Sequence, residues 1–148
     1  MNTVLLAVDE DEFADAIVDF VSRHNWPDDT AFTVVSVMEP VKIGNLMAVL
    51  PGPVLDDLEE ARSKECKRVN ERACARLAQA LKGRGQVKPV VCEGFAREEI
   101  LSLARTIEAS CIVIGSHGKR IMRRMMLGSV SLAVVSQASC TVCVVHLD

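Results

Sequence analysis

The feature that most constrains the fold is a regular alternation between short apolar runs and amphipathic helical segments. Five runs have the length and residue types of buried strands: Thr3–Asp9, Ala31–Met38, Gln86–Cys92, Cys111–Gly115 and Cys140–Leu147. Between them, apolar residues recur at helical spacing over about Asp11–His24, Leu55–Leu81, Glu98–Glu108 and Ser129–Ala138. Strands that alternate with helices form a parallel sheet with helices on both faces and right-handed crossovers. The sequence therefore predicts an α/β fold with a five-stranded parallel sheet, in a single domain over residues 1–148.

The charge and hydropathy of the chain exclude several classes of protein. The 148 residues carry a net charge of −3, so general affinity for nucleic acid or for an anionic membrane is not expected. No apolar run approaches the ~20 residues of a membrane span. The beginning of the chain lacks the basic segment of a secretory signal, and cysteines without such a signal are typical of a reducing compartment. We therefore expect a cytoplasmic protein with neither a nucleic-acid nor a membrane partner.

The six cysteines do not form a credible metal site. Cys140 and Cys143 have C-x-x-C spacing, but they belong to a strand pattern, in which positions three apart face opposite ways. We interpret the cysteines as thiols that pack like small hydrophobic side chains. Sensitivity of Cys66 or Cys74 to oxidation is the alternative.

A glycine-bearing loop follows the strand Cys111–Gly115 and precedes the helix that begins near Ser129. It carries Gly115, Gly118 and, after nine intervening residues, Gly128. Glycine lets the backbone approach an anion closely, and the N–H groups of a helix's first turn point toward it. The spacing is neither that of the P-loop nor that of the dinucleotide-binding fingerprint. The loop nevertheless predicts a phosphate site.

Gly115, Gly118, Gly128 and Ser129 together resemble the G-x2-G-x9-G-[S/T] signature of the ATP-binding branch of the universal stress protein family. The order of the elements is similar from end to end. The resemblance implies a Rossmann-like fold, similar to the adenine nucleotide alpha-hydrolases, with strand order 3-2-1-4-5. In such sheets the ligand lies where the strand order reverses, beyond the carboxyl ends of the strands. Asp9, ending the first strand, and Gly115, ending the fourth, would border that crevice.

The resemblance also implies roles for single residues around the nucleoside. Ala7 would pack on adenine, and the backbone of Val37 would recognise the edge of the base. The carboxylate of Asp9 would accept a hydrogen bond from a ribose hydroxyl or from the base amine. Gly115 would lie under the ribose, with Ile114 beside it.

A second set of residues would hold the phosphates through backbone N–H groups and serine hydroxyls: Gly118, Gly128, Ser129, Val130 and Ser131. The two serines have another interpretation, since serine often caps helices. Lys119 and Arg120 would neutralise a polyphosphate, or else belong to a solvated charged loop. His117 lacks an obvious base partner and is interpreted as a positioned loop residue. We assign no catalytic residue.

Glu10 and Asp11 depart from the family pattern, in which small residues often follow the aspartate. Two more carboxylates would repel a triphosphate unless Mg²⁺ or Mn²⁺ bridges them. The alternative is that they favour the dipole of the helix that begins there. The expected cofactor is ATP or another adenine nucleotide, with the metal requirement left open.

Three functions remain open from the sequence. The first is an ATP-binding regulatory or stress-response module; the second is a slow ATP hydrolase or nucleotidyl-transfer enzyme; the third is a dimer that has lost nucleotide binding. The first is favoured, because transfer needs an activated nucleophile or a positioned base. The long connection Glu39–Pro53 is interpreted as a functional flap or as a loop that packs its own apolar residues.

The last strand predicts a homodimer. Thr141–Leu147 is apolar and would lie at a sheet edge, where a long apolar strand is an aggregation hazard unless something pairs with it. The resemblance implies antiparallel pairing of this strand with its twin. A charge at Val144 should therefore yield monomers.

Overall fold

The computed structural model describes residues 1–40, 50–117 and 127–147. Its strands are β1 (Thr3–Ala7), β2 (Ala31–Met38), β3 (Gln86–Glu93), β4 (Cys111–Gly115) and β5 (Thr141–Val145). Its helices are α1 (Asp11–Arg23), α2 (Gly52–Leu81), α3 (Ala96–Thr106) and α4 (Ser129–Gln137). Strands and helices alternate throughout, which is the order predicted from the hydrophobic pattern.

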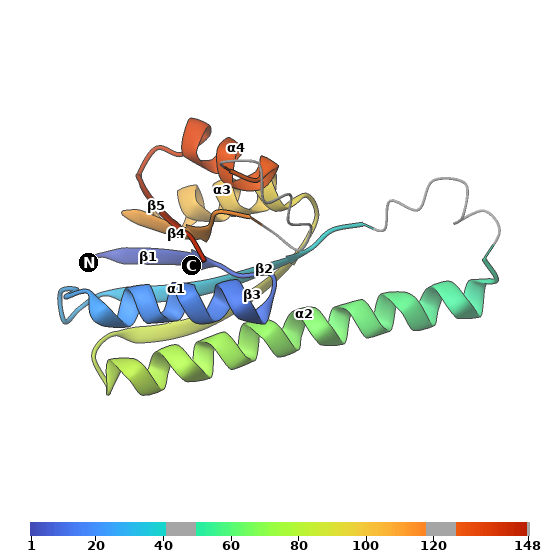
Figure 1. Cartoon of the computed structure of the whole chain (residues 1–148), viewed down its shortest axis with the longest axis horizontal. Helices are drawn as coiled ribbons and strands as arrows, with labels where there is room; N and C mark the ends of the chain where they lie inside the picture. The colour runs from blue at the N-terminus through green and yellow to red at the C-terminus, as the bar shows by residue number, and fades with distance from the viewer. Residues whose placement is uncertain (41–49, 118–126, 148) are drawn as a thin grey trace.

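The strands form one parallel sheet in the order β3-β2-β1-β4-β5, as predicted. Helices α1 and α2 cover one face and α3 and α4 the other (Figure 1). Each face has its own apolar cluster, the first built around Leu6 and Ile17 and the second around Leu5 and Ile112. Successive residues of β1 thus point to opposite faces, and both faces are buried, as expected for a parallel sheet.

The predicted ends of three strands need correction. β1 ends at Ala7 rather than Asp9, because after Val8 donates its N–H to the Val35 carbonyl (2.9 Å) the chain turns into α1. β5 spans Thr141–Val145 rather than Cys140–Leu147, since the five residues of β4 are its partners. β3 extends one residue beyond the prediction, to Glu93, which pairs with Met38.

Helix α3 lies two residues earlier than predicted, at Ala96–Thr106 instead of Glu98–Glu108. Its start is fixed from outside the helix, because the carboxylate of Glu39 accepts the N–H of Ala96 (2.9 Å). Its end is fixed by the backbone: Glu108 has a φ of 50°, which a right-handed helix does not accept.

Helix α2 begins at Gly52 rather than Leu55, with Pro51 as its N-cap and Pro53 in its first turn. Proline suits that position because its fixed φ is already helical. The two remaining helices, α1 and α4, each end one residue earlier than predicted, since His24 and Ala138 are extended C-cap residues.

Only the second half of α2 is packed into the core. All its buried residues lie between Val69 and Leu81, and the first half extends beyond the sheet (Figure 1). Arg62 of this first half donates to the backbone carbonyl of Glu39 (2.6 Å), just after β2. Residues 41–49 of this connection lie outside the described residues, so the two interpretations of Glu39–Pro53 stay open. Among the described residues, no helix is long and apolar enough to cross a bilayer.

Candidate functional site

The end of β4 and the start of α4 are joined directly. The Gly128 N–H donates to the Ser116 carbonyl (2.7 Å), and the Ser131 hydroxyl donates to the Gly115 carbonyl (2.6 Å). Ser116 and Ser131 are both buried. These bonds hold the first turn of α4 against the carboxyl end of β4, although residues 118–126 between them are not described.

The first turn of α4 carries backbone N–H groups that the helix itself does not bond. Gly128 is the N-cap, with φ −69° and ψ 163°, and no side-chain hydrogen bond caps this helix within the described residues. The first helical bond runs from the Leu132 N–H to the Gly128 carbonyl, so the N–H groups of Ser129, Val130 and Ser131 precede the helical bonding pattern. Such groups bind anions well.

The two serines of this turn differ. Ser129 is exposed, and the N-cap position belongs to Gly128 rather than to Ser129. Ser131 uses its hydroxyl to hold Gly115, which leaves its backbone N–H as the group to offer a phosphate. Ser131 thus holds the first turn of α4 against the end of β4.

Three residues predicted to surround the nucleoside fall in one apolar cluster. Ala7 pairs in register with Ile114 on β4, and Val37 lies near the end of the neighbouring β2. All three belong to the cluster on the α3 and α4 face, with Ala7 and Ile114 buried and Val37 half-buried. This places an apolar surface at the carboxyl ends of β2, β1 and β4, beside the start of α4.

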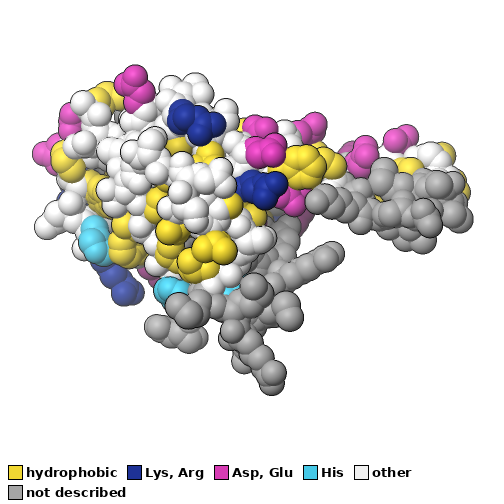
Figure 2. Space-filling model, turned by 90° about the horizontal axis from the view of Figure 1, so that it is seen from above, with side chains coloured by type: hydrophobic (Ala, Val, Ile, Leu, Met, Phe, Trp, Pro, Cys, Tyr) yellow, Lys and Arg dark blue, Asp and Glu magenta, His cyan; other side chains and the backbone are white. Residues whose placement is uncertain are grey.

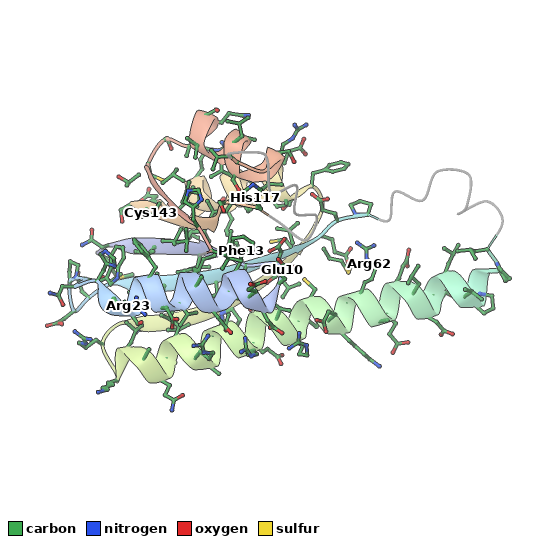
Figure 3. The ribbon with its side chains drawn as sticks, viewed as in Figure 1. Glu10, Phe13, Arg23, Arg62, His117 and Cys143 are labelled. Carbon is green, nitrogen blue, oxygen red and sulfur yellow. The ribbon has the colours of Figure 1, made fainter. Side chains whose placement is uncertain are left out.

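Gly115 has a packing reason to be glycine. A Cβ there would lie 2.6 Å from Cδ1 of Phe13, a buried side chain of α1. The bare backbone therefore lets α1 sit closely over the end of β4. Figure 3 shows Phe13 and Glu10 at the end of α1 nearest this site, with Arg23 at the other end.

The acidic turn between β1 and α1 is tied to α2 through Asp11. Asp9 is exposed and Glu10 is half-buried, and Asp11 is bound by two arginines of α2. Arg68 approaches one oxygen of Asp11 to 2.8 Å, and Arg72 the other to 3.3 Å. The charge of Asp11 is therefore compensated on the α2 side, which removes part of the repulsion expected from the sequence.

Other predicted residues are placed less fully. Gly118, Lys119 and Arg120 lie outside the described residues. His117 Nδ1 lies 3.1 Å from the Ser116 hydroxyl. Within residues 1–40, 50–117 and 127–147, no group of three or more His, Cys, Asp or Glu side chains could hold a metal ion.

Cys140 and Cys143 face opposite ways, as the strand pattern predicted. Cys140 contacts the cluster on the α3 and α4 face, and Cys143 the cluster on the other face. Cys143 Sγ lies 3.8 Å from Cys111 Sγ. Burial raises the pKa of Cys111 to about 12, so this thiol is neutral at physiological pH.

A separate surface hollow of about 350 Å³ lies at the amino ends of the strands, lined in part by Asp28, Thr30 and Gly85. This position is away from the switch point where α/β sheets bind ligands.

Sequence reasoning missed the residues that connect the site to its surroundings. Glu39 caps α3, and Arg68 and Arg72 hold Asp11. The arginines could have been found, because they are four residues apart on one helix and Asp11 and Asp15 are four apart on another.

Comparison with known proteins agrees with the geometry. Residues 1–146 match the model of the Universal stress protein family. A universal stress protein of Mycolicibacterium smegmatis is 28% identical over 98% of this chain, and the chain spans about half (48%) of that protein's length. The solved structure of the universal stress protein UspA from Lactobacillus plantarum is 23% identical, covers 97% of both chains and has a TM-score of 0.76.

Two similar structures contain adenine nucleotides. One, from Arabidopsis thaliana, has AMP bound; it is 13% identical, with a TM-score of 0.67 over 100% of this chain and 93% of that one. The other is a universal stress protein in complex with cAMP, 17% identical, with a TM-score of 0.64 over 99% and 98% of the chains. At these identities the likeness shows a shared fold.

Proposed function

Because this chain belongs to the universal stress protein family, we propose that it binds an adenine nucleotide, ATP in the first place, at the carboxyl edge between β1 and β4. The observation that carries the proposal is the first turn of α4, whose N–H groups precede the helical bonding and which is held to the end of β4 beside apolar side chains. AMP and cAMP in two relatives of the same fold support the choice of adenine.

In this proposal each part of the site has a separate task. Ala7, Val37 and Ile114 contact the base and its edge, and Asp9 accepts a hydrogen bond from the ribose or the base amine. Gly115 leaves room beneath the sugar. The phosphates bind to the N–H groups of residues 129–131, which Gly128 leaves unobstructed, and, by the family signature, to Gly118, Lys119 and Arg120. A bridging Mg²⁺ or Mn²⁺ would offset the carboxylates of the β1–α1 turn.

The protein acts as a regulatory or stress-response module of the cytoplasm rather than as an efficient enzyme. Nucleotide occupancy is its signal. Incubation with labelled ATP in single-turnover amounts tests this: intact ATP recovered with the protein supports a binding module, whereas stoichiometric ADP or a labelled protein would support an enzyme.

The nucleotide itself is tested by mass analysis of small molecules released from the purified protein. We expect an adenine nucleotide, and an increase in thermal stability when ATP is added to stripped protein. The Gly128→Val variant should lose affinity, because a side chain at the N-cap obstructs the phosphate. Gly52→Val is the matched control, since nothing lies within 4 Å of a Cβ there. Equal affinity of Gly128→Val and wild type would refute the site.

The module is proposed to be a homodimer that pairs its β5 strands. β5 is an edge strand, and its apolar side chains are half-buried within the single chain. The adjacent α4 adds exposed apolar side chains, Leu132 (54% exposed) and Val135 (44%). Figure 2 views this side of the molecule and shows hydrophobic side chains gathered on it. An exposed apolar area of this kind marks an interface.

A further inference from the structure

Two rows of opposite charge face each other between α1 and α2. Asp11, Asp15 and Asp19 are spaced four residues apart on α1, and Arg68, Arg72 and Arg76 are spaced four apart on α2. We call these six residues the charge ladder. Spacing by four places each row on one side of its helix.

The ladder is continuous. Arg68 and Arg72 both bind Asp11, Arg72 and Arg76 both bind Asp15, and Arg76 also reaches Asp19 (3.4 Å). Aspartates later in α1 pair with arginines later in α2, so the two helices run in the same direction (Figure 1). The ladder therefore fixes the position of α1 along the axis of α2.

One end of the ladder lies at the proposed nucleotide site and the other does not. Asp11 is the first residue of α1, two residues after Asp9, whereas Asp19 is two turns further along. Both carboxylate oxygens of Asp11 are engaged by arginine, at 2.8 Å from Arg68 and 3.3 Å from Arg72. These bonds draw the Asp11 carboxylate toward α2.

We propose that Arg68 and Arg72 are positioning residues for phosphate binding, which they support by holding the Asp11 carboxylate on α2. The inference rests on the proposed function. The bonds of these arginines supply its reason: a carboxylate released at the start of α1, two residues after the Asp9 that the proposed function places at the nucleotide, would add an uncompensated negative charge that opposes a polyphosphate. Arg76 has the same chemistry at the far end of the ladder and does not touch Asp11.

The first test compares Arg68→Met/Arg72→Met with Arg76→Met, by calorimetric titration of the full chain with AMP, ADP and ATP. We expect the double variant to lose about tenfold in ATP affinity at low salt, less for ADP and least for AMP, because repulsion grows with phosphate charge. Arg76→Met should bind like wild type. Arg68→Lys/Arg72→Lys keeps the charge and should retain most of the affinity.

The second test separates positioning from direct attraction between arginine and phosphate. Asp11→Asn should restore ATP affinity in the Arg68→Met/Arg72→Met background and change it little in wild type. If the arginines simply attracted the phosphates, Asp11→Asn would have the same effect in both backgrounds, and that additivity would overturn the inference. Equal losses for AMP and ATP, or an equal loss in Arg76→Met, would also overturn it.

The outcomes also distinguish this inference from the proposed function. If wild type binds no adenine nucleotide in the same titrations, the proposed function fails and the inference fails with it. If wild type binds ATP and the double variant binds it equally well, the inference alone fails. Thermal unfolding of every variant shows that the compared proteins are folded.

Discussion

The two edges of the sheet are built differently. At the β3 edge, the Gln86 N–H donates to the carbonyl of Thr30, just before β2, and the Gly94 N–H donates to the carbonyl of Met38 in β2. The backbone N–H groups of even-numbered residues therefore point toward β2, and those of odd-numbered residues point outward. Pro89 occupies an outward position, where its missing N–H removes a donor from the edge. Lys88 and Glu93 add exposed charges. This edge is protected from pairing with another strand.

The β5 edge has none of these devices within its described strand. The Val145 carbonyl accepts the Ser116 N–H, so the backbone polar groups of odd-numbered residues point toward β4. The backbone polar groups of Val142 and Val144 therefore point outward. The strand is Thr-Val-Cys-Val-Val, with no proline and no charge. The comparison teaches that one edge is closed to strand pairing and the other is left open for it.

The largest expected effect is a change of oligomeric state on placing a charge at each edge in turn. Val144→Lys should convert the proposed dimer to monomers, because a desolvated ammonium opposes strand pairing. Val91→Lys, at an exposed position of β3, is the matched control and should leave the dimer intact. Light scattering during gel filtration measures both. An unchanged elution volume for Val144→Lys would refute pairing through β5.

A smaller effect is expected beside the open edge, at Gly115, which pairs with Val145. Gly115→Ala should lower the free energy of unfolding by about 1–3 kcal/mol, because its Cβ would overlap the Phe13 ring. Chemical denaturation measures the loss. Phe13→Leu should recover part of it in the double variant. A Gly115→Ala protein as stable as wild type would contradict the packing described here.

Removing the protection of the closed edge should have a weaker effect. Pro89→Val restores an outward N–H and should produce concentration-dependent association beyond the proposed dimer, seen by sedimentation velocity. It should also cost about 0.4–1 kcal/mol of stability, since the unfolded chain gains freedom. If Pro89→Val sediments like wild type at every concentration, the proline is not what closes this edge.

The smallest effect concerns the charge ladder, which lies away from both edges. A hydrogen bond from Arg72, with the charge of Arg76, lowers the pKa of Asp15 below its ordinary value of 3.8 despite partial burial. Its stabilising contribution is therefore present above pH 3.8 and is lost as the pH falls through the lowered value.

Asp15→Asn should therefore destabilise the protein at neutral pH, by about 0.5 kcal/mol or less after solvent screening, and have no such effect in strong acid. Urea unfolding of both proteins at neutral pH and in strong acid, at about pH 2, measures the difference. If Asp15→Asn loses the same stability at both pH values, the ion pairs of the ladder are not the source of that stability.

Much of the fold was predictable because it depends on local periodicity. Buried runs such as Cys111–Gly115 need no partner to be recognised, since both faces of a parallel strand are apolar. Helix ends were less predictable. The start of α3 depends on Glu39, which is 57 residues away in the chain and brought near by the sheet.

The candidate site was predicted in outline, and its internal bonds were not. The glycine spacing pointed to the junction of β4 and α4, where Gly128 and Ser116 are indeed bonded. The sequence could not show that Ser131 holds Gly115, nor that Phe13 requires a glycine there. Both contacts join residues that no local pattern relates.

The sequence by itself determined the alternation of strands and helices, the apolar edge strand and the position of the glycine-bearing turn, since each is carried by neighbouring residues. The tertiary structure alone decided which charges meet. Asp11 and Arg68 are far apart in the chain, and their pairing follows from packing α1 and α2 side by side on one face of the sheet. Ion pairs depend on distance in space, which periodicity along a chain does not fix.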